Sequence, residues 1–193
     1  GLRSPFGSDF PLYALIEAEG YDQARDQAVF DETLAAALDA GLLDDAVIAQ
    51  SERDVQHFWE IRDGIGEIQP KLYPAIVFDV SLPLGAMPAF LAEADAELGR
   101  AFGSYRNLVF GHIGDNNLHL VTTTGRVEDM GRIGDIVYAV TGRHGGSISG
   151  EHGVGTLRRP YLQHSRSAAE IALMQALKRC LDPKGILNPG RVI

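Results

Sequence analysis

The chain has 193 residues, of which 45% are hydrophobic and 22% charged, a balance that excludes a coiled coil, a collagen or a disordered tail and indicates one or two globular units. Its 17 Lys and Arg against 26 Asp and Glu give a formal net charge of −9, which argues against nucleic acid or an anionic membrane as a partner. No apolar run reaches the roughly 20 residues that span a bilayer, and a single cysteine fits a reducing compartment, so we expect a cytoplasmic protein.

The first third of the chain is expected to hold two strands and two helices after an N-terminal linker at residues 1–11. Residues 12–18 have the composition of a strand, and residues 22–40 carry apolar side chains close to helical spacing. Residues 46–49 are predicted as a second, short strand. Ser51 is a good N-cap for the helix that follows it.

The remaining elements predict an α+β fold. Residues 75–82 are the most strand-like segment, and residues 87–98 are predicted to form an amphipathic helix. Residues 107–123 are predicted to form a hairpin of two strands. Helices are expected at 127–143 and 168–181. Strands alternating with helices favour a ferredoxin-like antiparallel sheet with helices on one face, followed by a C-terminal helical tail.

The hairpin is predicted to bring two histidines together. Asp115-Asn116 is the expected two-residue turn, because Asx residues tolerate positive φ. With this turn His112 lies directly opposite His119, at the roughly 4.5–5.5 Å Cβ separation that lets two imidazoles share a metal ion. The core-facing side would carry Val109, Ile113, Leu118 and Leu120. A pair of histidines that only covers a sheet surface remains the alternative.

A glycine-rich segment, residues 145–155, holds the other candidate site residues. Its glycines permit close approach of the backbone to a ligand. Glu151 is a candidate third metal ligand, in a set that keeps coordination positions open as catalytic metals require. The side chain of His152, the next residue, would point in a different direction from that of Glu151 and would serve as a general base. The alternative is a glycine-rich turn with a solvated Glu-His pair.

Three segments in order carry a family resemblance, namely HIGDNNLH at 112–119, SISGEHGVG at 147–155 and DPKGILNPG at 182–190. With WEIR at 59–62 and FDVSLP at 78–83, they resemble the C-terminal half of FAD-linked oxidases of the vanillyl-alcohol oxidase superfamily. The similar group contains the glycolate oxidase subunit, D-lactate dehydrogenase and D-2-hydroxyglutarate dehydrogenase. The resemblance extends from residue 12 onward.

The resemblance implies that two parts of the chain have different functions. Residues 12–144 would form a ferredoxin-like substrate-binding cap, and residues 145–193 would pack on an FAD-binding domain. It also implies a divalent cation, usually zinc, and a base beside it. The residues at these positions are His112, His119 and Glu151 for the metal and His152 for the base.

The resemblance further assigns residues to the substrate and the flavin. Arg62 would bind the substrate carboxylate through its planar guanidinium, and Arg158 would add a second cation. Asn188 lies in the segment that approaches the flavin. Considered without the resemblance, Arg62 reads as a solvent-facing helix residue and Asn188 as part of a turn.

Four positions depart from the family pattern, and at one of them Arg158 keeps the positive charge of the usual lysine. Val77 stands where a lysine is usual, Gly66 stands where a threonine or serine is usual, and Asn116 replaces a glycine in the turn. Asn116 is tolerated because Asn adopts positive φ more readily than most residues. The departures at Val77 and Gly66 concern the substrate, above all a dicarboxylate such as 2-hydroxyglutarate.

We therefore expect part of an enzyme that oxidises a D-2-hydroxy acid, such as D-lactate or glycolate, to the 2-oxo acid. The metal would make the hydroxyl easier to deprotonate, and the C2 hydride would pass to FAD. By itself the chain is expected to bind no FAD tightly and to be inactive. The sequence indicates neither the electron acceptor nor whether the chain forms a homodimer. The alternatives are a non-catalytic metal-binding or dimerising module and, more weakly, metal-assisted hydrolysis.

Overall fold

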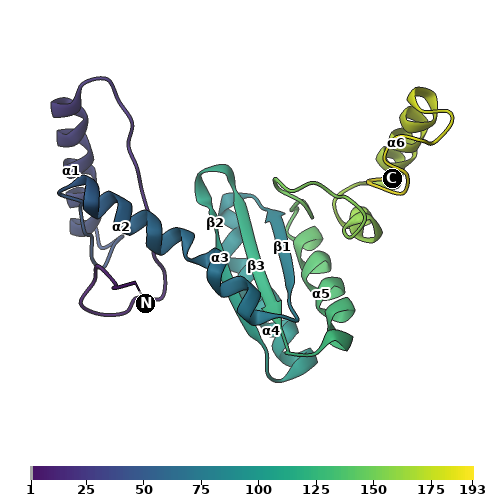
Figure 1. The fold of residues 1–193 in the computed structure, drawn as a ribbon, viewed down its shortest axis with the longest axis horizontal. Coiled ribbons are helices and arrows are strands. Elements are labelled where there is room, and N and C mark those ends of the chain that lie inside the picture. Colours follow the sequence, from purple (N-terminus) through teal and green to yellow (C-terminus); the bar gives the residue numbers. More distant parts are fainter. Residues whose placement is uncertain (1) are drawn as a thin grey trace. The chain divides into compact units, whose positions relative to one another are not determined.

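A computed structural model describes residues 2–193 of the chain (Figure 1). The chain divides into two units, Gly1–Ile68 and Gln69–Ile193, and each is described by itself. Among the described residues, no helix is both long enough and apolar enough to cross a membrane.

The first unit contains helices α1 (Gln23–Asp39), α2 (Glu52–Asp63) and the single turn α3 (Ile65–Ile68). The predicted N-cap is confirmed, because the Ser51 side chain accepts a hydrogen bond from the backbone N–H of Asp54.

The two strands predicted in this unit, at residues 12–18 and 46–49, are wrong. Within the described residues 2–68, both segments are irregular and neither pairs with another strand. The apolar side chains of the first are not buried, since Leu12 is 84% exposed and Ile16 55% exposed. Strand-like composition reflects fit to a half-buried pleated surface, and this segment has no such surface to join.

The second unit is built on a three-stranded antiparallel sheet. Its strands are β1 (Ile76–Ser81), β2 (Arg106–His112) and β3 (Asn117–Thr123), in the order β1-β3-β2. Helix α4 (Met87–Phe102) connects β1 to β2, and α5 (Met130–Arg143) follows β3. These elements confirm the expected α+β class.

The helices α4 and α5 pack on the same face of this sheet (Figure 1). Phe78 and Leu120 from the sheet share one buried core with Phe90 of α4 and Val137 of α5. The other face of the sheet is therefore free to present polar side chains.

After α5 the chain returns to the edge of the sheet beside β1. Ser147 and Ser81 exchange backbone hydrogen bonds of 2.7 and 3.1 Å as an isolated antiparallel bridge. A ferredoxin-like fold has its last strand after the second helix, and here that position is reduced to this bridge. The residues after Ser147 therefore do not continue as a strand, and they form a loop over the face of the sheet opposite α4 and α5.

The C-terminal part of the second unit contains the short helix η5 (Arg159–His164) and α6 (Ala168–Leu181). Helix α6 begins with a capping box, in which Ser167 and Glu170 each bond to the other's backbone N–H. The other short 3₁₀ helices are η1 (Gln69–Leu72), η2 (Leu84–Ala86), η3 (Ile113–Asp115) and η4 (Val127–Asp129).

The hairpin forms with a different register from the predicted one. Its turn is η3 followed by Asn116 at φ 63°, so His112 pairs with Asn117 and His119 pairs with Phe110. The two-residue turn and the direct opposition of His112 and His119 are wrong. The shift is by two residues, however, and only an odd shift would move side chains to the other face. Both histidines therefore remain on the face opposite the helices.

The longer turn also changes the predicted core face of the hairpin. Leu120 is buried and Leu118 packs against the core, as expected. Val109 pairs with Leu120 and so lies on the predicted face, although it is 39% exposed on the edge strand β2. Ile113 is 66% exposed, which is contrary to the prediction. Ile113 lies in the turn itself, beyond the ladder that would have directed it inward.

Candidate metal centre

Two neighbouring strands place an acid and a histidine side by side on the open face of the sheet. Asp79 of β1 is the Cα partner of His119 of β3 in the antiparallel ladder. Residues so paired have adjacent side chains on one face. Asp79 is 0% exposed and His119 4% exposed, so both lie at the floor of the site.

The glycine-rich loop is held against this floor by hydrogen bonds to Asp79. The backbone N–H of Gly150 donates to the Asp79 carbonyl at 3.0 Å, and the N–H groups of Glu151 and His152 donate to Asp79 Oδ2 at 3.1 and 2.8 Å. A Cβ at Gly150 would overlap the side-chain amide of Asn117. Glycine is therefore required for the loop to approach this closely.

The three predicted metal ligands come together at this point. His119 Nε2 lies 3.0 Å from Glu151 Oε1, and the rings of His112 and His119 are perpendicular with centroids 5.7 Å apart. One ligand atom from each of these residues lies within 4.8 Å of the others. His112 reaches His119 diagonally across the ladder rather than directly.

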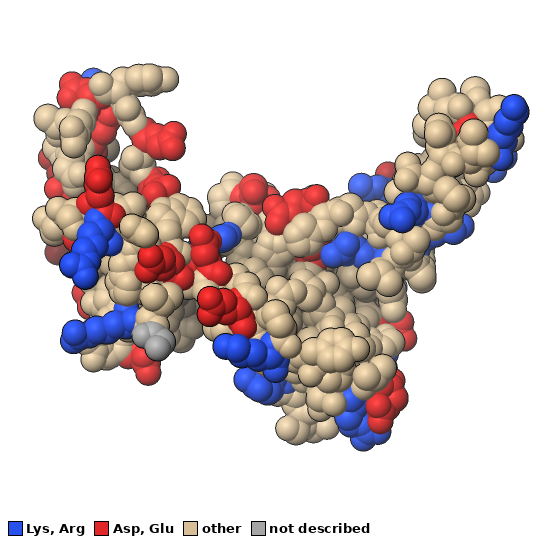
Figure 2. Space-filling model, viewed as in Figure 1, with Lys and Arg blue, Asp and Glu red and all other residues tan. Residues whose placement is uncertain are grey.

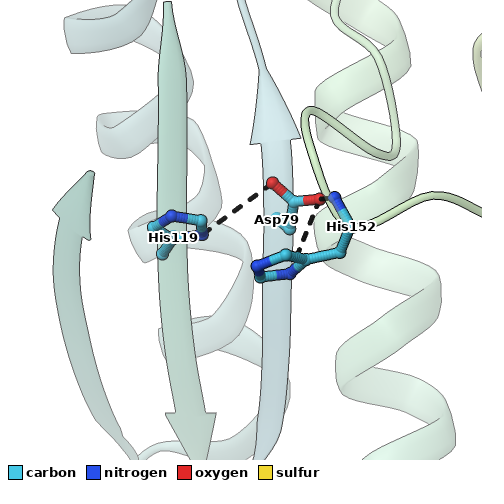
Figure 3. Close-up of side chains that lie close together, drawn as sticks. All are labelled: Asp79, His119 and His152. Atoms are coloured by element: carbon cyan, nitrogen blue, oxygen red, sulfur yellow. Dashed lines mark hydrogen bonds and ion pairs between the residues drawn. The ribbon is translucent and has the colours of Figure 1, made fainter. Parts of the chain in front are cut away.

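His152 lies on the other side of His119. Their rings stack with centroids 5.3 Å apart and planes 15° apart. Asp79 faces both rings, with its Oδ1 3.8 Å from His119 Nδ1 and its Oδ2 3.7 Å from His152 Nδ1 (Figure 3). The remaining nitrogen, His152 Nε2, is 3.5 Å from Glu151 Oε1.

The surroundings of the two buried groups set their charges. Burial raises the pKa of Asp79, but hydrogen bonds from the His152 backbone and the Asn117 amide outweigh it, so the pKa is lowered and the carboxyl is ionised. Burial lowers the pKa of His119 and outweighs the opposing effect of Asp79 and Glu151. His119 is thus neutral at pH 7, which is the form of imidazole that binds metals.

Comparison with known proteins assigns the chain to a family. The model of the family described as FAD linked oxidases, C-terminal domain, matches residues 2–192. The chain belongs to this family.

Curated relatives cover the whole chain at moderate identity. It is 38% identical to a D-2-hydroxyglutarate dehydrogenase of Stutzerimonas stutzeri over 99% of the chain. It is also 38% identical to a mitochondrial D-2-hydroxyglutarate dehydrogenase of Arabidopsis thaliana over 100% of the chain, and 35% identical to the Rattus norvegicus protein of that name over 95%. The chain spans 42% of the length of the first and 34% of each of the other two.

The donor set of this C-terminal domain fits the divalent metal that the family resemblance implies. Two imidazoles and one carboxylate match catalytic zinc sites, in which a further position is left for water or substrate. His119 supplies a neutral ring, while Glu151 is exposed and its side chain remains accessible from solvent. The residues present are therefore chemically suited to hold such an ion.

The other predicted site residues have different positions. Arg158 lies beside the loop, where its Nη1 donates to the Gly153 carbonyl at 2.9 Å. Asn188, at φ 45°, lines a groove with Leu177 of α6. Arg62 ends α2 in the first unit, where its Nη1 is 3.1 Å from Asp63 Oδ1.

Asp79 is the site residue that sequence reasoning did not assign. Its signal is visible in the sequence, because it is the one charged residue in the apolar segment AIVFDVSL at 75–82. A buried charge in a strand is costly unless it is paired. Its pairing partners, however, come from segments distant in the sequence.

Proposed function

We propose that this chain is the substrate-binding C-terminal part of an FAD-dependent dehydrogenase that oxidises a D-2-hydroxy acid to the 2-oxo acid. The observation that carries the proposal is the convergence of His112, His119 and Glu151, with His152 beside them. The names of the relatives, D-2-hydroxyglutarate dehydrogenases, support the same class of reaction.

Each residue of the cluster has a distinct role in this proposal. His112, His119 and Glu151 hold a divalent ion, with zinc the best match to their donor atoms. When bound, the ion would supply Lewis acidity that makes the substrate hydroxyl easier to deprotonate, and FAD would supply the acceptor for the C2 hydride. His152 accepts the hydroxyl proton at Nε2, because its Nδ1 faces Asp79.

Two cations are assigned to the substrate in addition to this cluster. Arg62 binds the substrate carboxylate, for which a planar guanidinium is suited. Arg158 contributes positive charge beside the loop, which it already contacts through Gly153. The net charge of the chain is −9, so local cations are needed to attract an anionic substrate into the site.

The substrate is proposed to be a small monocarboxylate such as D-lactate or glycolate. Val77 lies on the same face of β1 as Asp79, and its Cα partner on β3 is Val121. At this place the family usually has a lysine, so the valine pair lacks the charge that would balance a second carboxylate. A dicarboxylate would leave that group without a cation, which is costly next to apolar side chains.

The domain arrangement of the parent protein is also a proposal. Residues 12–144 form the substrate-binding cap, and residues 145–193 pack on the FAD-binding domain, which Asn188 approaches. Helix α6 supports this, because its leucines at successive turns are unburied within the described residues: Leu173 is 60%, Leu177 53% and Leu181 79% exposed. Such an apolar stripe is typical of a helix face that packs on another domain.

Metal analysis tests the proposal most directly. We expect the intact protein to bind one divalent ion and the His112→Ala variant to lose it, because removal of one of three ligands leaves an incomplete set. His57→Ala is the matched control, since His57 lies in α2 and bonds to the Arg3 carbonyl. Equal metal in the wild type and His112→Ala would contradict the site.

A substrate panel on the intact protein tests the proposed substrate, and it should favour D-lactate or glycolate over D-2-hydroxyglutarate.

A further inference from the structure

One buried carboxylate connects every part of the proposed site. Asp79 is 0% exposed, yet it has no lysine or arginine among the ion-pair partners found in the described part of the chain. A buried charge persists only when hydrogen bonds or opposite charges compensate for its lost hydration. The compensation at Asp79 comes from donors that belong to the site.

Both oxygens of this carboxylate accept hydrogen bonds. Oδ1 accepts from Asn117 Nδ2 at 2.7 Å and from the Glu151 N–H at 3.3 Å. Oδ2 accepts from the His152 N–H at 2.8 Å, the Glu151 N–H at 3.1 Å and the Ser149 hydroxyl at 3.2 Å. The three residues of the loop that donate to Asp79 include both of its proposed functional residues.

The same carboxylate faces the two stacked rings. His119 Nδ1 is a buried nitrogen without a hydrogen-bond partner among the described residues, and Asp79 Oδ1 lies 3.8 Å from it. This separation is too long for a hydrogen bond, so Asp79 acts on the ring through its negative charge, which favours the proton on the nitrogen that faces it. With a proton on Nδ1, His119 presents its Nε2 lone pair toward Glu151 and the proposed ion.

Asp79 could instead be a metal ligand, since it forms a second group with His119 and His152 whose ligand atoms lie within 4.8 Å of one another. The hydrogen bonds argue against this role. A carboxylate has about four lone-pair positions, and the donors from residues 117, 149, 151 and 152 already occupy them. Binding an ion would require these donors to be given up.

We propose that Asp79 is the positioning residue of the site, which anchors the loop so that Glu151 reaches the metal beside His119 and His152 reaches the substrate hydroxyl. This deepens the proposed function, and its metal-affinity test rests on that function. The anchoring itself depends only on the contacts of the loop with β1.

Hydrogen exchange in the metal-free intact protein tests the anchor. Asp79→Asn keeps the shape of the side chain but turns an NH₂ group toward N–H donors, which leaves them unpaired. We expect loss of exchange protection at the amides of Glu151 and His152. Thr122→Val is the matched control, because it removes a buried hydroxyl bonded to Asn107 in the same sheet without touching the loop. Unchanged protection in Asp79→Asn would overturn the proposal.

Metal titration gives the functional readout. Supporting residues behind metal ligands typically contribute 10–100-fold to metal affinity, so the Kd of Asp79→Asn for Zn²⁺ should rise by about that factor while Thr122→Val keeps the wild-type value. Equal Kd values in the wild type and Asp79→Asn would overturn the proposal. If Asp79→Asn does not fold, Ser149→Ala replaces it. Lost protection at Glu151 would then support the anchor, and retained protection would overturn it.

The two proposals fail in different ways. A wild-type protein that binds no metal, or that binds it equally after His112→Ala, contradicts the proposed function and leaves the exchange measurement intact. A wild type that binds metal and an Asp79→Asn variant with wild-type affinity and loop protection contradict only the role of Asp79.

Discussion

At the scale of single residues, the site shows how one polar group can organise several others. His119 is neutral because it is buried, whereas Asp79 stays ionised because loop N–H groups bond to it. The same part of the site thus holds a neutral imidazole, the form that can bind a metal, and a fixed negative charge. His152 stacks on this ring with 48% of its side chain exposed, so it is the histidine of the stacked pair that a substrate can reach.

Substitution of His152 tests its role as a base. We expect His152→Ala in the intact protein to lower kcat by about 10²–10⁴-fold, the usual contribution of a positioned general base. Metal content should be unchanged, because the ligand set does not include His152. The measurement is steady-state kinetics with D-lactate beside metal analysis, and near wild-type kcat would contradict the assignment.

Much of the site could be predicted from sequence, and the part that could not has a physical reason. Strand alternation, a local property, was sufficient to place His112 and His119 on one face, and the family resemblance then assigned Glu151 as the third candidate ligand. The role of Asp79 was not accessible in this way. Its donors come from residues 117 and 149–152, and only the folded sheet brings them within hydrogen-bond distance.

At the scale of elements, the hairpin shows which errors leave a site intact. The predicted turn was too short by two residues, yet His112 and His119 kept the same face because strand side chains alternate with a period of two. A shift of one residue would have placed His112 and His119 on opposite faces of the sheet. The chemistry of the hairpin therefore depends on the parity of its register more than on its turn.

Helices α4 and α5 are joined by an ion-pair network that should respond to acid. Glu93 Oε1 is 2.9 Å from Arg143 Nε and its Oε2 2.6 Å from His144 Nε2. The bond to His144 lowers the pKa of Glu93 below the ordinary 4.5, against a smaller opposing effect of burial. Because the folded-state pKa is the lower one, the stabilisation is complete above pH 4.5 and is lost as the pH falls through the folded-state value.

Melting temperatures of the wild type and Glu93→Gln measure this contribution. We expect the wild type to melt higher at pH 7 and the difference to shrink as the pH falls below 4.5 and passes through the lowered pKa of Glu93. Glu97→Gln is the comparison, because Glu97 contacts Arg143 and Arg100 but not His144. A difference that is constant with pH would contradict the prediction.

At the scale of the whole molecule, charge and exposed apolar surface are unevenly distributed. The C-terminal segment is basic within an acidic chain, and Figure 2 shows several of its cations on one face. Residues 145–193 carry Arg158, Arg159, Arg166, Lys178, Arg179, Lys184 and Arg191 against Glu151, Glu170 and Asp182. Together with the unburied leucines of α6, this distribution is typical of a segment that packs on another domain.

A charge placed in the leucine stripe tests this packing. We expect Leu177→Asp in the intact protein to make residues 145–193 more sensitive to limited proteolysis and to lower FAD affinity about 10–100-fold, the equivalent of one buried leucine at roughly 1.5–3 kcal/mol. Gln175→Asp adds the same charge on an exposed polar position of α6. Equal cleavage in the two variants would argue against a docked α6.

The sequence by itself determined the α+β class, the helices at 22–40, 87–98 and 168–181, and the group of three metal-ligand candidates. The class and the helices depend on periodicity, capping and turn residues, which act over a few neighbouring positions, whereas the three candidates were grouped by the family resemblance. The tertiary structure decided the hairpin register, the absence of strands among residues 2–68 and the contacts of Asp79. Each of these depends on a contact with a partner strand, a sheet surface or a hydrogen-bond donor from a distant part of the chain. Local sequence patterns do not determine such contacts.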